Sequence, residues 1–436
     1  MRQRLLSEGA NELSYEIRGI VKKAHQVRAL GNTIFWENIG DPVNKHYQLP
    51  DWIKEIVVEI VQDNATFGYC DSKGVLETRQ FLAELNNQRN GAQITADDVL
   101  FFNGLGDAIS KLYQYLVPTS RVIGPSPSYS THSSAEASHA NHHPITYNLD
   151  PNNNWYPELG DMHMKIKYNP NIVGILLINP DNPTGVVYPR DILEAIVEIA
   201  RAYDLFLVAD EIYLNITYNG AKAHALAEVI GEVPGISMKG ISKELPWPGA
   251  RCGWMEFYNR QQSADFDRYC TTLENAKMIE VCSTKLPQLA IPKVMSDPRY
   301  KAYRQGFNDA IGQRSRIISG LLEDIPAITF NPTYGAFYNT IIFRDGILKP
   351  GQQLAIEDPR AKDLLGNWFA QEPDMALDKR FVYYLLAAKG VCVVPISSFC
   401  SDLQGFRVTL LENDEAILRE TFTRIREAVI EFVGSV

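Results

Sequence analysis

The sequence predicts an α/β fold, with a mostly parallel central sheet in a large domain and a smaller α/β domain after it. Short apolar stretches alternate with helical ones between residues 99 and 257, a pattern typical of strands joined by helical crossovers. Residues 173–178 (VGILLI) are apolar on both alternating faces, which suits a strand covered by helices on both sides. The rest of the chain adds a second α/β stretch.

The first expected elements form an N-terminal arm and part of the smaller domain over residues 1–47. We expect a helix over 18–30 and an extended piece over 33–39 in this arm. The next helix is indicated by apolar residues at i, i+3, i+4, i+7 and i+8, namely Ile53, Ile56, Val57, Ile60 and Val61. Strands are then predicted at 99–102, 121–124, 173–178, 205–209, 236–238 and 252–257.

The large domain is expected to cover residues 48–298, and the smaller domain residues 299–436. A final helix over 414–432 is predicted from an apolar stripe of Leu418, Phe422, Ile425, Val429 and Phe432. Residues 345–378 are polar and interrupted by proline and glycine. That composition predicts a surface insertion in the smaller domain.

The composition excludes several classes of protein. The 436 residues include 42 Lys and Arg against 52 Asp and Glu, a net charge of −10, which argues against binding to nucleic acid or anionic lipid. No apolar run has the length of a membrane helix, and the N-terminus lacks the apolar core of a signal peptide. The six cysteines form no C-x-x-C pair, so zinc and a disulfide framework are not expected. We expect a reduced, cytoplasmic enzyme.

Polar motifs follow several of the predicted strands. The sequence NPDNPTG at 179–185 follows one strand, Asp210 to Tyr213 another, and Ser242-Lys243 a third, with Arg251 eight residues further on. Gly104-Leu-Gly106 also follows a strand and leads into a helix. Ligands of open α/β sheets bind at the carboxyl ends of strands, so we expect these residues to share one site.

Each motif alone is ordinary. A single lysine is usually a surface lysine, and Asn-Pro and Thr-Gly favour plain turns. The Gly-x-Gly pair lacks the third glycine of the dinucleotide fingerprint. His132, His139, His142 and His143 lack the spacing of a metal site, so we interpret them as loop or packing residues and expect no metal.

In this order and spacing, however, the motifs resemble the pyridoxal-phosphate aminotransferases of fold type I, in the class I/II family of alanine and aspartate aminotransferases. The best-matching blocks are INPDNPTG, VADEIY, ISKELPWPGARCGW and GFRVTLLENDE. The resemblance runs from Tyr15 to the final helix. It implies pyridoxal 5′-phosphate as cofactor and ping-pong transfer of an amino group from an L-amino acid to a 2-oxo acid.

The resemblance also implies roles around the cofactor's ring. Lys243 matches the Schiff-base lysine, which becomes a free base near the substrate Cα once it is displaced. Asp210 matches the carboxylate that keeps the ring nitrogen protonated, although an aspartate here could instead cap a helix. Asn182 and Tyr213 match the donors to the phenolate oxygen. Tyr129 matches the ring over the pyridine face, with loop packing as the alternative.

The cofactor's phosphate is expected at Arg251 and at the N–H groups of Leu105 and Gly106, because a helix N-terminus favours an anion. One departure from the family concerns Gly240, where a serine usually contacts the phosphate. Whether Ser242, just before the lysine, compensates is left open by the sequence.

Substrate recognition is expected from Arg407, which matches the arginine that grips the α-carboxylate with a bidentate fork, and from the backbone at Gly40. A structural ion pair is the alternative for Arg407. Arg18 lies in the arm and could meet a distal carboxylate, or else pair with an acid on its own helix. Tyr69 matches the tyrosine that reaches the phosphate of a second subunit, which implies a homodimer with composite sites.

Two other functions fit this resemblance. One is a different reaction on the same cofactor, a β-lyase or a decarboxylase. The other is a non-catalytic regulator, although such regulators carry a DNA-binding domain ahead of this fold and only fourteen residues precede Tyr15. The segments around Tyr15 and FRVTLL resemble alanine-type relatives, but the amino donor stays open between alanine and aspartate types.

Overall fold

The larger sheet has eight strands in the order β2-β9-β8-β7-β6-β3-β4-β5 in the computed structural model, which describes residues 6–13 and 16–435. Pairing is parallel from β4 through β3, β6 and β7 to β8, and antiparallel at both ends of the sheet. The predicted α/β fold is confirmed, with a mixed sheet whose centre is parallel. The strands are β2 (Val99–Phe102), β3 (Arg121–Ser126), β4 (Thr146–Asp150), β5 (Tyr156–Pro157), β6 (Ile172–Ile178), β7 (Phe206–Asp210), β8 (Gly235–Gly240) and β9 (Gly253–Tyr258).

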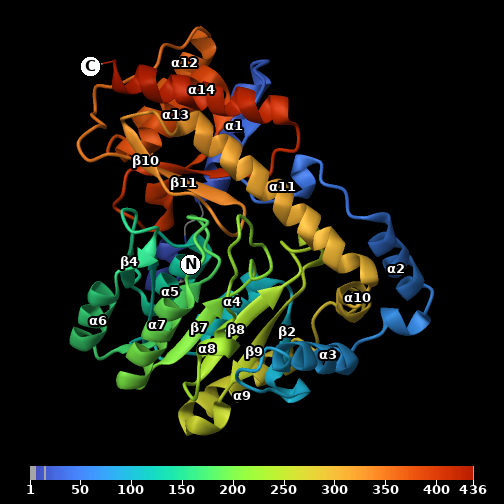
Figure 1. Ribbon diagram of the computed structural model, residues 1–436. Coiled ribbons are helices and arrows are strands. Elements are labelled where there is room, and N and C mark those ends of the chain that lie inside the picture. Colours follow the sequence, from blue (N-terminus) through green and yellow to red (C-terminus); the bar gives the residue numbers. More distant parts are fainter. Residues whose placement is uncertain (1–5, 14–15, 436) are drawn as a thin grey trace, which may run out of the picture.

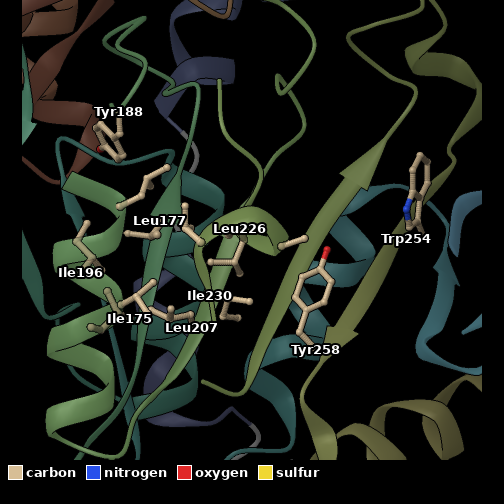
Figure 2. Packing of buried hydrophobic residues seen from close by; sticks show 14 of the residues in the cluster. Ile175, Leu177, Tyr188, Ile196, Leu207, Leu226, Ile230, Trp254 and Tyr258 are labelled. Carbon is tan, nitrogen blue, oxygen red and sulfur yellow. The ribbon is translucent and has the colours of Figure 1, made fainter. Parts of the chain in front are cut away.

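Helices cover both faces of this sheet, which explains why its central strands are apolar throughout. Ile175 and Leu177 of β6 point to one side, where they pack with Ile196 of α7 and with Leu226 and Ile230 (Figure 2). Leu176 and Ile178 point to the other side, toward α4 and α9. The covering helices are α4 (Leu105–Gln114), α5 (Ser130–Ala140), α6 (Leu159–Tyr168), α7 (Arg190–Ala202), α8 (Leu226–Val229) and α9 (Ala264–Ile279).

The second sheet is antiparallel and has the order β10-β11-β14-β13. Its strands are β10 (Ile328–Phe330), β11 (Tyr338–Phe343), β13 (Val394–Pro395) and β14 (Gly405–Thr409). A separate core forms around it, built in part by α12 (Pro359–Gln371), α13 (Leu377–Lys389) and α14 (Glu415–Val433). In Figure 1 this part of the chain lies beyond the strand ends of the large sheet.

The N-terminal arm packs into the second sheet's core. The helix α1 (Glu16–Ala29) buries Ile20, Ala24 and Val27 there, and β1 (Phe35–Trp36) pairs in parallel with β12 (Val391–Cys392). After the arm come α2 (Asp51–Val61), α3 (Leu76–Asn87) and, later in the chain, α10 (Lys285–Met295). The long helix α11 (Pro298–Leu322) runs from α10 to the second sheet's core (Figure 1).

The stretch 345–378, which we expected to be a surface insertion, contains the helix α12. Ala361, Leu365 and Trp368 of that helix are buried in the second core. We interpreted Pro359 as a residue that interrupts secondary structure, but proline is favoured in the first turn of a helix. Asp358, whose side chain accepts from the backbone N–H of Arg360, is its N-cap.

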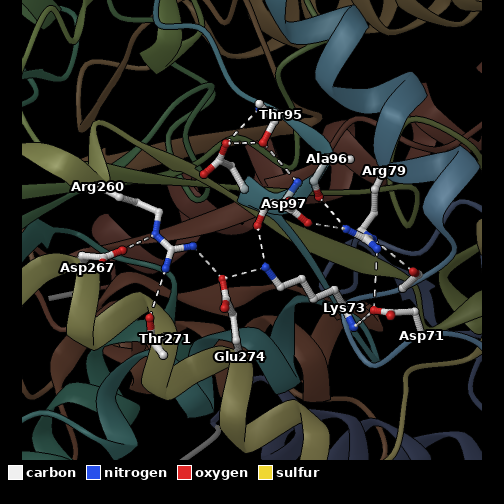
Figure 3. Close-up of polar contacts among 12 residues, drawn as sticks. Asp71, Lys73, Arg79, Thr95, Ala96, Asp97, Arg260, Asp267, Thr271 and Glu274 are labelled. Atoms are coloured by element: carbon white, nitrogen blue, oxygen red, sulfur yellow. Dashed lines mark hydrogen bonds and ion pairs between the residues drawn. The ribbon is translucent and has the colours of Figure 1, made fainter.

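A network of ion pairs fastens the edge of the large sheet near α3 and α9 (Figure 3). We call it the rim network; it comprises Asp71, Lys73, Arg79, Asp97, Arg260, Asp267 and Glu274. Glu274 meets Arg260 at 2.6 Å and Lys73 at 3.2 Å. Arg79 lies 3.6 Å from both Asp71 and Asp97. Each cation of the network thus has a carboxylate partner.

Across residues 6–13 and 16–435, no helix combines the length and the apolar character needed to cross a membrane.

Candidate active site

The polar motifs predicted from the sequence converge on one cavity of about 840 Å³. The cavity lies at the carboxyl ends of β2, β6, β7 and β8, and the arm and the second sheet supply the rest of its wall. This is the edge where an open α/β sheet binds its ligands. The predicted residues in the wall are Arg18, Gly40, Leu105, Gly106, Tyr129, Asn182, Asp210, Tyr213, Ser242, Lys243, Arg251 and Arg407.

Tyr69 is the one predicted site residue that does not line this cavity. Its side chain is 82% exposed, and the neighbouring Phe67 is 74% exposed. Neighbouring aromatic side chains with this degree of exposure are unusual on a monomer surface unless another molecule covers them.

Lys243 lies three residues beyond the end of β8 and is half-buried. Its Nζ donates a hydrogen bond to the carbonyl oxygen of Gly40, 2.7 Å away, and lies 5.8 Å from the centre of the Phe337 ring. It makes no ion pair with a described residue. The amine therefore projects into the cavity with only a neutral acceptor to hold it.

Asp210 is the last residue of β7 and is 3% exposed. Its Oδ2 lies 3.0 Å from Nε2 of His132, and its Oδ1 accepts from the backbone N–H of Ile212 at 3.1 Å. A turn follows Asp210, and the next helix is α8, so the helix-cap interpretation is wrong. The structure shows a buried carboxylate that is held in place from two sides.

His132 is one site residue that the sequence interpretation missed. We expected a loop or packing histidine, and the ring is indeed completely buried, but it contacts Asp210. The feature of the sequence that could have identified His132 is its position three residues after Tyr129. The backbone N–H of His132 donates to the carbonyl of Tyr129 at 2.9 Å, so the start of α5 presents both side chains to one region.

Arg407 on β14 is 2% exposed and points into the cavity wall. Its Nη1 donates to Oδ1 of Asn182 at 3.1 Å, and its Nη2 donates to the carbonyl of Asn38. The guanidinium carbon lies 4.4 Å from the centre of the Tyr338 ring. Arg407 has no carboxylate partner among the described residues, so the structural ion pair considered from the sequence is not found.

Tyr213 reaches the cavity beside Tyr338, and their hydroxyl oxygens lie 3.0 Å apart. Burial, followed by the proximity of Tyr338, holds the pKa of Tyr213 well above its ordinary value. Its phenol therefore keeps its proton and can donate. Tyr338 was not predicted because it comes from β11, 125 residues away in sequence.

Another corner of the cavity combines a helix N-terminus with a cation. Gly104 precedes α4 with a φ of 84°, and a Cβ built on it would lie 2.5 Å from Nη2 of Arg251. Only glycine allows that approach. The guanidinium of Arg251 donates to the carbonyl of Pro248 at 3.1 Å and has no carboxylate partner in the described ranges.

The departure at Gly240 has a steric explanation. A Cβ there would lie 2.9 Å from the carbonyl oxygen of Cys252, so any side chain would collide with the neighbouring strand. Ser242 lies in the wall of the cavity instead.

The arm contributes Arg18 and Lys22, which lie one turn apart on α1 and both line the cavity. Residues four apart share a helix face. Neither makes an ion pair with a residue that the structure describes. Tyr15, the residue at which the family resemblance began, lies outside the described residues.

Comparison with known proteins identifies relatives that match almost the whole chain. The family profile of class I and II aminotransferases matches residues 37–425. An uncharacterized aminotransferase of Methanocaldococcus jannaschii is 53% identical over 433 residues, 99% of this chain and 100% of that protein. The glutamate-pyruvate aminotransferase AlaA of Escherichia coli is 31% identical over 338 residues, 76% of this chain and 81% of that protein.

Among solved structures, an alanine aminotransferase from Pyrococcus furiosus superposes with a TM-score of 0.83 at 27% identity, covering 98% of this chain and 100% of that one. The profile match, the identities and the fold agree with the residues gathered in the cavity. This chain belongs to the class I and II aminotransferase family, and it is an aminotransferase.

Proposed function

We propose that this aminotransferase exchanges amino groups between L-amino acids of the alanine and glutamate or aspartate types and their 2-oxo acids, in the cavity described above. One observation carries the proposal. Lys243, Arg251, Arg407, Arg18 and Lys22 all line the cavity without an ion pair to any described residue. Cations that the protein does not neutralise favour anionic ligands, here a phosphate and one or two carboxylates.

Class I and II aminotransferases use pyridoxal 5′-phosphate, and the residues present fit that group. Arg251 and the N-terminus of α4 suit the phosphate, and glycine at 104 leaves the backbone open there. Asp210 is a buried carboxylate for a protonated ring nitrogen, and Lys243 is an amine for the aldehyde. Bound in this way, the cofactor supplies an electron sink for a carbanion.

Within the site, each side chain has a separate task. Lys243 would hold the cofactor's aldehyde carbon and, as a free amine, would be the base for the proton at the substrate Cα. Asp210 accepts a hydrogen bond from the protonated ring nitrogen, while His132 holds its other oxygen. Asn182 and Tyr213 donate to the phenolate oxygen, and the ring of Tyr129 covers one face. Ser242 would supply a hydroxyl near the phosphate, and the backbone N–H groups of Leu105 and Gly106 would be further donors to it.

The substrate's α-carboxylate binds Arg407, with the backbone at Gly40 beside it. In the structure the guanidinium rests on neutral acceptors, Asn182 and the carbonyl of Asn38. A carboxylate is a stronger acceptor than either. The group of Gly40 that can donate to this carboxylate is its backbone N–H, because its carbonyl oxygen is an acceptor and is hydrogen-bonded to Nζ of Lys243.

A distal carboxylate binds Arg18. An exposed guanidinium that pairs with no described acid can pair with the side chain of glutamate or aspartate, yet it does not block a substrate as small as alanine. The relative in Escherichia coli is named for glutamate and pyruvate, which is consistent with one site serving both side chains.

The functional unit is a homodimer with composite sites. The exposed apolar residues Phe67, Tyr69, Met278, Ile279 and Val281 lie in two adjoining segments. The segments meet where Sγ of Cys70 contacts the carbonyl of Ser283 at 3.8 Å. A second copy would cover this surface and bring its Tyr69 toward the phosphate of the first.

The experiment that tests the substrate assignment is a panel of amino acids assayed against 2-oxoglutarate and pyruvate, with wild type and Arg18→Ala. We expect Arg18→Ala to raise the KM for glutamate and aspartate by up to about fivefold, since Arg18 is exposed and an exposed charged pair is worth under about 1 kcal/mol. The KM for alanine should change little.

Arg28→Ala is the matched control, because Arg28 is exposed in the last turn of the same helix. Equal effects on alanine and on the dicarboxylic substrates would show that Arg18 serves the scaffold. The mass of the protein in solution, with Tyr69→Ala beside wild type, tests the dimer.

A further inference from the structure

The turn after β6 connects the large sheet, the cavity and the second sheet. The backbone N–H of Asp181 donates to the carbonyl of Val186 at 2.9 Å, and the N–H of Gly185 donates to the carbonyl of Asp181 at 3.0 Å. On its outer side, Oγ1 of Thr340 donates to the carbonyl of Pro183 at 2.9 Å. Thr340 is paired in register with Arg407, so this turn sets how Asn182 meets Arg407.

The carboxyl group of Asp181 closes the turn from inside and is completely buried. Its Oδ2 accepts from the backbone N–H of Thr184 at 3.0 Å and from the Thr184 hydroxyl at 2.5 Å. Its Oδ1 has no hydrogen-bond partner. A buried carboxylate usually has a cation beside it, yet Asp181 makes no ion pair with the residues described.

None of the titratable groups that face Asp181 would stabilise a negative charge on its carboxyl group. Asp210 ends the neighbouring strand, and its carbonyl accepts from the N–H of Asn179 at 3.1 Å. Tyr147 of β4 and Tyr188 beyond the turn are buried phenols. Burial, above all, raises the pKa of Asp181 to about 7. The two donors of Thr184 favour the charged form, but burial outweighs them, and the orphaned oxygen and the carboxylate of Asp210 add to the preference for the neutral acid.

We propose that Asp181 is a positioning residue, which in its protonated form holds the turn that orients Asn182 beside Arg407, and which on losing its proton disturbs that arrangement. The proton leaves to solvent, and a second negative charge then stands near Asp210 in the interior. The role at Asn182 rests on the proposed function, whereas the ionisation of Asp181 does not.

The sign of the effect follows from linkage. Between the ordinary value of 3.8 and about 7, the folded protein keeps a proton that the unfolded chain has released. The free energy of unfolding therefore falls as pH rises between these two values, and above the higher one it no longer changes with the ionisation of Asp181. If only the protonated form orients Asn182, kcat/KM should fall about tenfold from one unit below the pKa to one unit above it.

The test compares wild type with Asp181→Asn, whose amide oxygen can still accept from Thr184 but which cannot ionise. In the cofactor-free protein we expect the urea midpoint of wild type to fall, relative to that of the variant, as pH rises from 4 to 7. In the holoenzyme we expect the variant to lack the tenfold fall in kcat/KM for glutamate. Asp191→Asn, an exposed acid in the first turn of α7, should keep both wild-type profiles.

Parallel stability profiles for wild type and Asp181→Asn would overturn the proposal. So would a shifted stability profile with an unchanged kcat/KM profile, because Asp181 would then titrate without positioning Asn182. Infrared difference spectra of wild type between pH 6 and 8 give an independent reading, since a protonated buried carboxyl group has a distinct C=O band; absence of that band at pH 6 would also overturn it. Lack of activity toward every amino acid in the panel would count against the proposed function alone.

Discussion

The rim network and the cavity use the same kinds of side chain in opposite ways. In the rim network, Lys73, Arg79 and Arg260 each meet a carboxylate within 3.6 Å (Figure 3). In the cavity, Lys243, Arg251 and Arg407 donate to carbonyl and amide oxygens instead. Cations with acids fasten one segment to another, whereas cations with neutral acceptors remain available to a ligand.

The difference is sharpest for Arg407. Its burial would be costly without compensation, since a charge removed from water needs partners. Amide and carbonyl oxygens, together with the faces of Tyr338 and Phe399, supply partial compensation. The site is therefore stable without a ligand but interacts more favourably with a carboxylate.

The largest effect is expected from Lys243→Ala. The amine both holds the cofactor and moves the proton, so kcat should fall by on the order of 10⁴-fold. The reading is turnover together with the mass of the protein after borohydride reduction. A reduced cofactor adduct that persists in the variant would identify another lysine, with Lys239 as the nearest in sequence.

Asp210→Ala should come next. It removes the charge opposite the ring nitrogen and leaves His132 without its partner, and loss of one preorganised electrostatic group costs about 10²–10³-fold in kcat. Asp191→Ala, at an exposed site, should be neutral. A loss smaller than about tenfold in steady-state assays would mean that Asp210 has only a structural part.

Arg407→Lys tests whether the geometry of the fork matters as well as the charge. Lysine keeps the cation but cannot make the bidentate contact, so KM should rise by about 10- to 100-fold for every amino acid, whatever its side chain. Steady-state kinetics with alanine and glutamate measure this. A rise confined to one of them would place Arg407 at the side chain instead of the α-carboxylate.

The smallest effect should come from the rim network. Glu274→Gln removes the acid shared by Arg260 and Lys73, and we expect a loss of about 1 kcal/mol in the free energy of unfolding, because partly exposed pairs contribute little. KM values should stay unchanged. A larger change in KM than in stability would show that the two regions are coupled.

The sequence predicted the strands and their polar ends well, because both depend on local patterns. The strand at 99–102 has the predicted bounds, and the motifs after β6, β7 and β8 reach one cavity. The position of Ser242 relative to Gly240 could not be predicted, since it depends on which side of a strand faces Cys252. The contact of Tyr338 with Tyr213 likewise depends on the register of β11, and that of His132 with Asp210 on the packing of α5.

The cavity's cations that form no ion pair with a described residue also affect how a substrate arrives. The chain as a whole carries a net charge of −10, so an anion diffusing toward it meets a repulsive field at long range. Physiological salt limits each field to about 8 Å. Attraction by Arg18 and Lys22 is then felt only at the mouth of the cavity. Capture is therefore a short-range event, and electrostatic steering from bulk solvent contributes little to the association rate.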